Sequence, residues 1–119
     1  MHNWKGILFK KLIRGVSVRS GRDTNGRLVI YHRGGGVKRL YRIVDFNRSV
    51  LDIAGEVIRI EYDPFRSAYI ALVCYSNGLI CYLLAAHGLA PKSRVVNGFL
   101  VENALSNSKP LRFMVEGSR

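Results

Sequence analysis

Two apolar runs separated by an Asn-Gly pair constrain the fold of this sequence more than any other feature. The runs are YIALVCY at 69–75 and LICYLLAA at 79–86, and Asn77-Gly78 lies between them. Asn-Gly favours the two-residue turn of a β-hairpin, because both residues readily adopt positive φ angles. The runs are therefore predicted to be antiparallel strands. The continuous apolar character of 69–75 further predicts a strand that is buried on both faces.

The string EVIRIEYD lies before this hairpin and alternates between apolar and polar side chains. Alternation with a period of two predicts a half-buried strand. Ile58, Ile60 and Tyr62 are expected to face one side of it. Arg59 and Glu61 are expected to face the other side.

Further short strands are expected on both sides of these segments. RLVIY at 27–31 and YRIVDF at 41–46 are β-branched and aromatic runs, and another strand is expected at 94–96. No long amphipathic helix is expected, because Asn97-Gly98 interrupts the best candidate region. The chain has 119 residues, of which 48% are hydrophobic, so one compact domain with a real core is expected. Short strands with turn signals between them predict a small all-β barrel or sandwich.

Positive charge is concentrated in the first half of the chain. The formal net charge is +11, and the sequence pI is about 10.3. Residues 1–50 carry twelve Lys or Arg against two Asp, a net charge of +10, whereas residues 51–119 carry seven against six acids. Such a balance predicts a polyanionic partner, either nucleic acid or an anionic membrane surface.

The membrane alternative rests on the basic N-terminal segment WKGILFKKLIRG. Its apolar run, Gly6 to Phe9, is too short for the core of a signal peptide. No stretch approaches the ~20 apolar residues that a membrane-spanning helix needs. A weak surface-binding amphipathic segment therefore stays open as an alternative, and nucleic acid is the preferred partner.

The sequence does not predict an enzyme or a metal site. It has no Gly-x-Ser-x-Gly elbow and no His-Glu-x-x-His motif. Asp45 is better explained as orienting nearby arginines, and Asp63 as capping the turn at Pro64. Cys74 and Cys81 form no CxxC pair, and they are expected to be reduced and buried. Catalytic residues, metal ligands and cofactors are therefore not expected, apart from Mg²⁺ associated with a bound RNA.

Three consecutive glycines lie inside the most basic part of the chain, in the string RGGGVKR at 33–39. The string matches neither the P-loop nor the dinucleotide-binding fingerprint. Glycine nevertheless lets a backbone approach a ligand closely, and successive amides can bind an anion. With Arg33, Lys38 and Arg39 beside it, the loop is predicted to lie against phosphates. The alternative is a flexible linker with solvated charges.

More arginines surround this loop, and aromatic side chains are interleaved with them. Arginine pairs with phosphate through two hydrogen bonds and stacks on bases. Tyr31, Tyr41 and Phe46 are candidates to stack on unpaired bases, or they belong to the core. The arginines that precede or follow the loop are Arg14, Arg19, Arg22, Arg27, Arg42 and Arg48.

Four motifs in order resemble the universal family of large-subunit ribosomal protein number two. They are Gly-Arg-x-x-Asn-Gly-Arg, His-Arg-Gly-Gly-Gly-x-Lys, Tyr-Arg-x-x-Asp-Phe and Glu-Tyr-Asp-Pro-x-Arg-Ser-Ala, and the similarity runs from Gly21 to at least Gly98. The resemblance implies a five-stranded OB-fold-like barrel whose basic extension and glycine loop contact large-subunit rRNA. The RNA contacts that it implies are Arg22, Asn25, Gly26, Arg27, His32, Arg33, Gly34, Gly35, Gly36, Lys38, Arg42 and Arg66.

The resemblance also implies a division of the chain. Residues 1–26 would form the basic extension, 27–105 the OB-fold RNA-binding domain, and 106–119 a segment leading to an SH3-like domain absent from this sequence. The family's histidine associated with peptidyl transfer lies in that other domain, so no histidine here inherits its role. Phe65 stands where the family usually has Asn, and the surroundings of His87 also depart from the pattern.

The sequence thus predicts a structural, non-enzymatic constituent of the large ribosomal subunit that binds rRNA near the peptidyl-transferase centre. Its expected partners are large-subunit rRNA, other large-subunit proteins and a separate polypeptide carrying the SH3-like domain. A mitochondrial ribosome in the matrix is the expected location, with a plastid or bacterial ribosome as the alternative. The alternative function is that of a free-standing OB-fold protein that binds single-stranded RNA or acts as an RNA chaperone.

Overall fold

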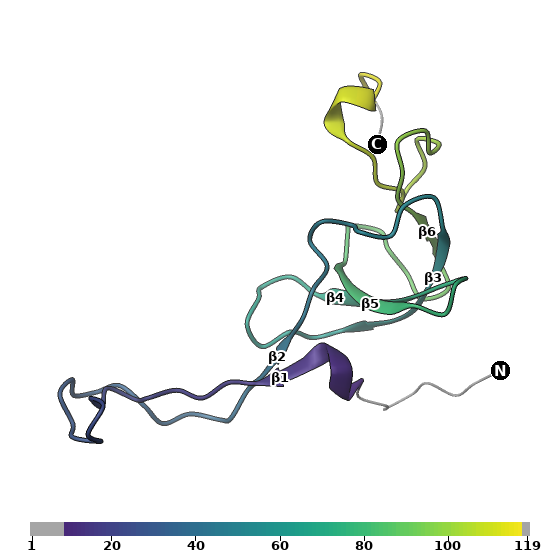
Figure 1. Cartoon of the computed structure of the whole chain (residues 1–119). Coiled ribbons are helices and arrows are strands. Elements are labelled where there is room, and N and C mark those ends of the chain that lie inside the picture. Colours follow the sequence, from purple (N-terminus) through teal and green to yellow (C-terminus); the bar gives the residue numbers. More distant parts are fainter. Residues whose placement is uncertain (1–8, 118–119) are drawn as a thin grey trace.

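The computed structural model describes residues 9–117 and consists of short antiparallel strands with two single-turn 3-10 helices. The strands of the described region pair as two separate sheets, β1 with β2, and β5-β4-β3-β6 in that order (Figure 1). The all-β prediction is confirmed. The elements are η1 (Lys10–Leu12), β1 (Ile13–Gly15), β2 (Leu40–Arg42), β3 (Ala54–Glu61), β4 (Ile70–Tyr75), β5 (Ile80–Leu84), β6 (Arg94–Val96) and η2 (Leu111–Phe113).

The two sheets do not close into the five-stranded barrel that was expected. Beyond β5 the chain adds a single parallel bridge, between Val44 and Tyr82, with one hydrogen bond from the Asp45 amide to the Tyr82 carbonyl (2.9 Å). Beyond β6 there is again one bridge, between Asn97 and Ser108. Among the described residues, each edge of the four-stranded sheet thus gains only a one-residue bridge, and no fifth strand closes the barrel.

The predicted hairpin forms between β4 and β5. Their pairing runs from Ile70 opposite Leu84 to Cys74 opposite Ile80. In the turn, Gly78 has a φ of +84°. Its amide donates to the Tyr75 carbonyl at 2.9 Å.

Strand β4 lies at the centre of the core and is buried on both faces, as predicted. Because side chains alternate along a strand, β4 contributes to two apolar clusters. The first consists of Val57, Ala71, Val73, Tyr75, Cys81, Leu83 and Val95. The second consists of Val44, Ile70, Leu72 and Tyr82. Cys81 belongs to the first cluster, whereas Cys74 is opposite Ile80 at the other face, so the two thiols do not meet and both are free.

A β-bulge in β3 overturns part of the predicted alternation. The register shifts between Val57 and Arg59, so one extra residue enters the strand. As a result Ile58 packs against the second cluster and Ile60 against the first. Tyr62 lies beyond the strand and is exposed. The expectation that Ile58, Ile60 and Tyr62 share one face is therefore wrong.

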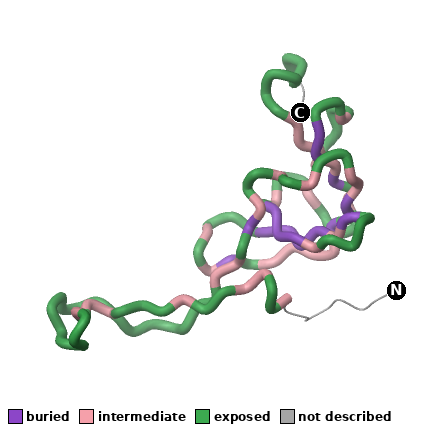
Figure 2. The backbone as a smooth tube through the Cα atoms, viewed as in Figure 1, coloured by how far each residue is buried: buried purple, intermediate pink, exposed green. Residues whose placement is uncertain are grey.

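The segment 16–39, which we call the arm, leaves β1 and returns into β2. It projects far from the four-stranded sheet (Figure 1), and it is exposed along nearly its whole length (Figure 2). The strand expected at 27–31 does not form, since this region keeps only one bridge, between Arg22 and Leu28. The amides of Val29 and Ile30 instead both donate to the Gly21 carbonyl at 3.0 Å, which bends the chain at that point.

Candidate nucleic-acid interface

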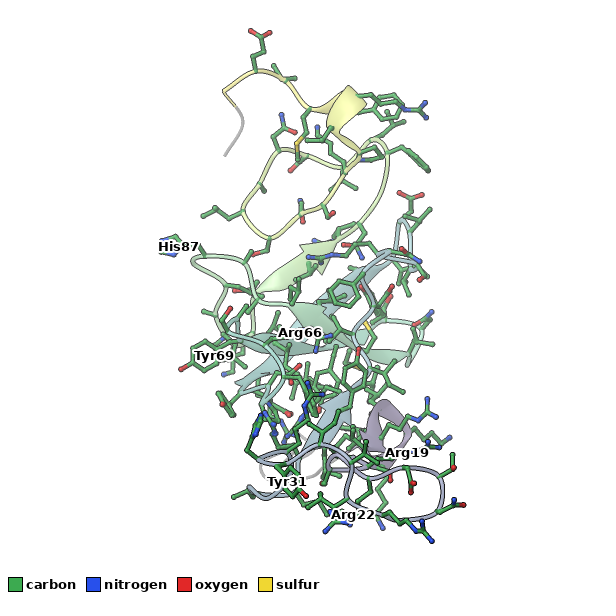
Figure 3. The ribbon with its side chains drawn as sticks, turned by 90° about the vertical axis from the view of Figure 1, so that its left-hand side faces the viewer. Arg19, Arg22, Tyr31, Arg66, Tyr69 and His87 are labelled. Carbon is green, nitrogen blue, oxygen red and sulfur yellow. The ribbon has the colours of Figure 1, made fainter. Side chains whose placement is uncertain are left out.

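The tip of the arm is a turn held by one carboxylate. Asp23 Oδ1 accepts hydrogen bonds from the amides of Asn25 (2.9 Å) and Arg27 (2.8 Å). The Asp23 amide donates to the Arg27 carbonyl at 3.0 Å, and Gly26 completes the turn with a φ of +78°. The acid thus organises the backbone here, while the neighbouring Arg22, Asn25 and Arg27 stay exposed. Arg19 and Arg22 gather with Tyr31 at this end of the molecule (Figure 3).

Two glycines let the outgoing and returning chains of the arm approach each other. A Cβ on Gly21 would lie 2.3 Å from the Ile30 carbonyl oxygen, and one on Gly34 would lie 2.7 Å from Ser20 Cβ. Both glycines also have positive φ angles, +74° and +121°. These positions therefore serve the internal packing of the arm.

Gly35 and Gly36 have a different environment. Their φ angles are +78° and +83°, yet nothing in the chain lies within 4 Å of the place where a Cβ would be. In the described structure, no backbone amide from His32 to Lys38 donates a hydrogen bond within the chain. The loop therefore presents free donors and an open backbone surface between exposed arginine and lysine side chains.

The predicted contact residues fall into three places. Twelve lie on the arm, namely Arg19, Arg22, Asn25, Gly26, Arg27, His32, Arg33, Gly34, Gly35, Gly36, Lys38 and Arg39, and all are exposed. Arg14, Arg42 and Arg66 lie at its base. Arg48 is separate, since its guanidinium donates to Asn97 Oδ1 at 3.5 Å near the end of β6.

Arg66 is engaged inside the chain. One terminal nitrogen forms an ion pair with Asp63, and the other donates to the Tyr41 hydroxyl at 3.2 Å. Its guanidinium carbon lies 5.4 Å from the ring centre of Tyr41 and 5.2 Å from that of Phe46. The hydrogen bond to Tyr41, followed by the Asp63 carboxylate, raises the pKa of Arg66 against the opposing effect of desolvation. In Figure 3 it lies above the arm residues, toward the sheet.

The separate roles expected of Asp63 and Asp45 have different outcomes. Asp63 caps its turn as predicted, because its carboxylate accepts the Phe65 amide at 2.9 Å. Asp45 instead accepts the amide (2.9 Å) and hydroxyl (3.0 Å) of Ser49 and forms no ion pair with an arginine in the described structure. The prediction that it orients Arg42 and Arg48 is therefore wrong.

Sequence reasoning missed one aromatic contact at the base of the arm. The Arg39 guanidinium carbon lies 5.3 Å from the ring centre of Phe65, and Tyr41 meets the same ring edge-on at 5.6 Å between centres. Phe65 is the position where the chain departs from the family pattern. That departure was the only available signal, and composition alone did not indicate a contact with the arm.

No catalytic or metal-binding arrangement emerges from residues 9–117. No three His, Cys, Asp or Glu side chains in that range are placed to hold a metal ion. The Cys81 thiol is buried, which raises its pKa to about 11 and suppresses the reactive thiolate at neutral pH. Within the same residues no helix is long and apolar enough to cross a membrane. The segment behind the membrane-surface alternative, residues 4–15, lies partly outside the described residues, since these begin at residue 9.

Residues 9–97 match the family described as "Ribosomal Proteins L2, RNA binding N-terminal domain". This chain belongs to the ribosomal protein L2 family. Its L2 relatives include the large ribosomal subunit protein uL2 of Rickettsia canadensis (strain McKiel), Rickettsia felis (strain ATCC VR-1525 / URRWXCal2) and Rickettsia akari (strain Hartford). Each is 44% identical to this L2 chain over 115 residues, which cover 97% of it and 42% of the relative. The chain thus spans about two fifths of the length of these L2 relatives.

Proposed function

We propose that this L2-family chain is a structural constituent of the large ribosomal subunit and binds large-subunit rRNA through its arm. The observation that carries the proposal is the loop at 32–38, where unpaired amides and left-handed glycines lie between exposed cations. Such a surface can follow a phosphate backbone closely, with amide donors and guanidinium groups acting together. The description of the matched family, which names RNA binding, supports it.

The position of the charge favours this function over that of a free-standing single-strand binder. A barrel that binds single strands uses a positively charged groove lined with aromatic platforms on its sheet. Here the sheet strands β3–β6 contribute only Arg59 and Arg94, and Arg59 is paired with Glu61. The arm instead carries six Lys or Arg together with the exposed Tyr31.

The proposal includes the finer predictions made from the sequence. Residues 1–26 act as a basic extension, 27–105 as the RNA-binding domain, and 106–119 as a C-terminal segment. The chain catalyses no reaction and works in a mitochondrial ribosome near the peptidyl-transferase centre. The relatives named above are bacterial, which keeps a bacterial ribosome as the alternative.

The first test measures how RNA affinity depends on salt. Replacing Arg33 and Lys38 by Ala should weaken binding to a large-subunit rRNA transcript and lower the slope of log K against log salt by about one unit per lost phosphate contact. The matched control is the double replacement Lys92→Ala and Arg94→Ala, which removes the same charge from exposed positions of the sheet domain. A slope that stays unchanged in the arm variant but falls in the control would contradict the proposal.

The second test asks whether the chain is part of a ribosomal particle. A tagged chain should sediment with large ribosomal subunits in a sucrose gradient. Cell fractionation before the gradient reports the compartment. Sedimentation only with free RNA would favour the single-strand binder.

A further inference from the structure

The carboxylate of Asp63 is fully buried, with 0% of its surface exposed. A buried charge is stable only when it is paired and hydrogen-bonded. Here the Arg66 guanidinium supplies the opposite charge, and the Phe65 amide donates a hydrogen bond at 2.9 Å. Arg66 is therefore fixed firmly to the 63–66 turn, which joins β3 to β4 in the four-stranded sheet.

The Arg66 guanidinium also contacts β2, the strand into which the arm returns. Tyr41, its hydrogen-bond and ring partner, is the middle residue of β2. Phe46, the second ring, follows β2 in the chain. Arg39 approaches the same turn from the arm, over Phe65 and within 3.5 Å of the Pro64 carbonyl. We call Arg39, Tyr41, Phe46, Asp63, Phe65 and Arg66 the clasp.

The clasp ties β2 itself to the sheet domain. Neither β1 nor β2 pairs with any strand of the four-stranded sheet. On the β1 side, Phe9 and Leu12 pack against the second apolar cluster. Beyond β2, Val44 belongs to the same cluster and pairs with Tyr82 through a one-residue bridge. These two contacts meet the sheet domain at one cluster, so the clasp at the 63–66 turn adds a separate point of attachment that limits pivoting of the two-stranded segment.

Arg66 exposes little of its side chain to a phosphate. One terminal nitrogen faces Asp63 and the other faces Tyr41, and only 18% of its side chain is exposed. Its charge is already compensated by the buried carboxylate. An arginine that contacts RNA needs a free edge of the guanidinium and an uncompensated charge.

We propose that Arg66 is a positioning residue, which holds β2 against the 63–66 turn and thereby presets the direction of the arm before RNA arrives. Its effect on RNA binding rests on the function proposed above. Its effect on the arm is a property of the free protein. Presetting the arm lowers the ordering cost of binding and so strengthens it without adding a contact.

The first experiment uses the protein without RNA. Residual dipolar couplings of the β1 and β2 amides should fit the same alignment tensor as those of β3–β6. In Arg66→Ala the couplings of β1 and β2 should shrink relative to those of the sheet. Arg94→Ala, which removes an exposed arginine from β6, should leave both sets unchanged. If the couplings of β1, β2 and β3–β6 in Arg66→Ala still fit a single alignment tensor, the proposal is overturned.

The second experiment separates positioning from direct contact. Arg66→Ala should weaken binding to the rRNA transcript by about tenfold. Its salt slope should match that of the wild type, whereas a lost phosphate contact would lower the slope by about one unit. A lowered slope would show that Arg66 touches RNA, which overturns the proposal. Absence of RNA binding in the wild type would refute the proposed function and leave the dipolar-coupling result standing.

A gentler variant keeps the test informative if Arg66→Ala fails to fold. Tyr41→Phe removes one hydroxyl and retains the ring beneath the guanidinium. It should show a smaller change of the β1 and β2 couplings in the same direction. Arg66→Lys keeps the charge pair with Asp63 but cannot also bond Tyr41, so it should restore folding with an arm that is only partly fixed. Wild-type couplings in both variants would contradict the proposal.

Discussion

Tyr31, Tyr41 and Phe46 lie in the most basic part of the chain, and their surroundings differ. Tyr41 is half-buried and contacts both Phe65 and Arg66. Phe46 lies against the Arg66 guanidinium. Tyr31 is 72% exposed and has no ring contact within the described structure. Of the three aromatic residues proposed to stack on RNA bases, Tyr31 is the most exposed, and within the described residues it is the only one without a contact to a ring or a guanidinium group, whereas Phe46 is 60% exposed.

The exposed ring of Tyr31 leads to a prediction about RNA binding. Tyr31→Ala should reduce affinity for the rRNA transcript by about 1–3 kcal/mol, because a base loses its stacking partner. Tyr31→Phe should retain most of the affinity, since stacking needs the ring and not the hydroxyl. Fluorescence anisotropy titrations at fixed salt measure both.

The matched control for this prediction is Tyr69→Ala. Tyr69 is 60% exposed and lies away from the arm, toward the sheet (Figure 3). Its replacement should leave RNA affinity unchanged. Equal losses from Tyr31→Ala and Tyr69→Ala would show that no stacking specific to the arm occurs.

For single residues, the sequence predicts what a side chain can bind better than it predicts which distant residues it will contact. The position of Asp63 directly before Pro64 was enough to predict the capping of the turn. The contacts of Arg66 with Tyr41 and Phe46 were not predictable, because they join positions that are distant in sequence and depend on how β2 meets the sheet. Exposure of the arm residues could be expected from their charge.

The arm shows that neighbouring glycines in one element can have different roles. Gly34 permits contact with Ser20, whereas Gly35 faces open space. The sequence predicts that the three glycines face phosphates as one unit. The structure divides that unit, because the close approach of Ser20 depends on the path of the outgoing chain, which local composition does not specify.

Replacing each glycine by alanine should separate these roles. Gly34→Ala should push Ser20 away and shift the amide resonances of residues 18–22, and RNA affinity should fall as the arm changes shape. Gly35→Ala should leave those resonances in place at a local conformational cost of about 1–2 kcal/mol, while RNA affinity still falls. NMR spectra and RNA titrations report the two effects.

Gly88 provides the control for backbone strain in this series. It has a φ of +81° and open space around it, but it lies outside the arm. Gly88→Ala should leave RNA affinity unchanged. If Gly35→Ala also left affinity unchanged, the open loop would not be a contact surface.

The strands divide into those that the sequence specifies locally and those that it does not. The β4–β5 hairpin was predictable because its apolar runs and its turn residues agree with each other. The bulge in β3 was not predictable, since an extra residue leaves no mark in an alternating string. RLVIY fails as a strand because Gly21 accepts two of its amides and no partner strand faces it along its length.

On the scale of the molecule, the core and the charge occupy separate parts. The two apolar clusters are both built around β4, while the arm, which is exposed along nearly its whole length (Figure 2), carries six Lys or Arg and contributes no residue to either cluster. Stability and RNA binding should therefore respond largely independently to mutation, with the clasp as the exception. The fold class followed from the sequence, whereas barrel closure depended on a pairing at Val44 that extends over only one residue.

The buried Tyr82 side chain makes the free energy of unfolding depend on pH. Burial, together with the neighbouring Glu61 carboxylate that accepts its hydroxyl at 2.9 Å, raises the pKa of Tyr82 to about 12 in the folded chain. The unfolded value is about 10. Because the folded pKa is raised, the neutral phenol is favoured on folding, and this contribution is fully present below pH ~10. It is lost as the pH rises through about 12.

Urea unfolding of the free protein at increasing alkaline pH should therefore show a falling free energy of unfolding over this window, of about 2–3 kcal/mol from Tyr82 alone. Tyr82→Phe should be less stable at neutral pH, because it loses the bond to Glu61, but its stability should fall less steeply between pH ~10 and ~12. Tyr62→Phe, at an exposed tyrosine beyond β3, should keep the wild-type pH dependence. If Tyr82→Phe and the wild type had the same alkaline slope, the phenol would not be held neutral by the core, and its place at the centre of the second apolar cluster would be wrong.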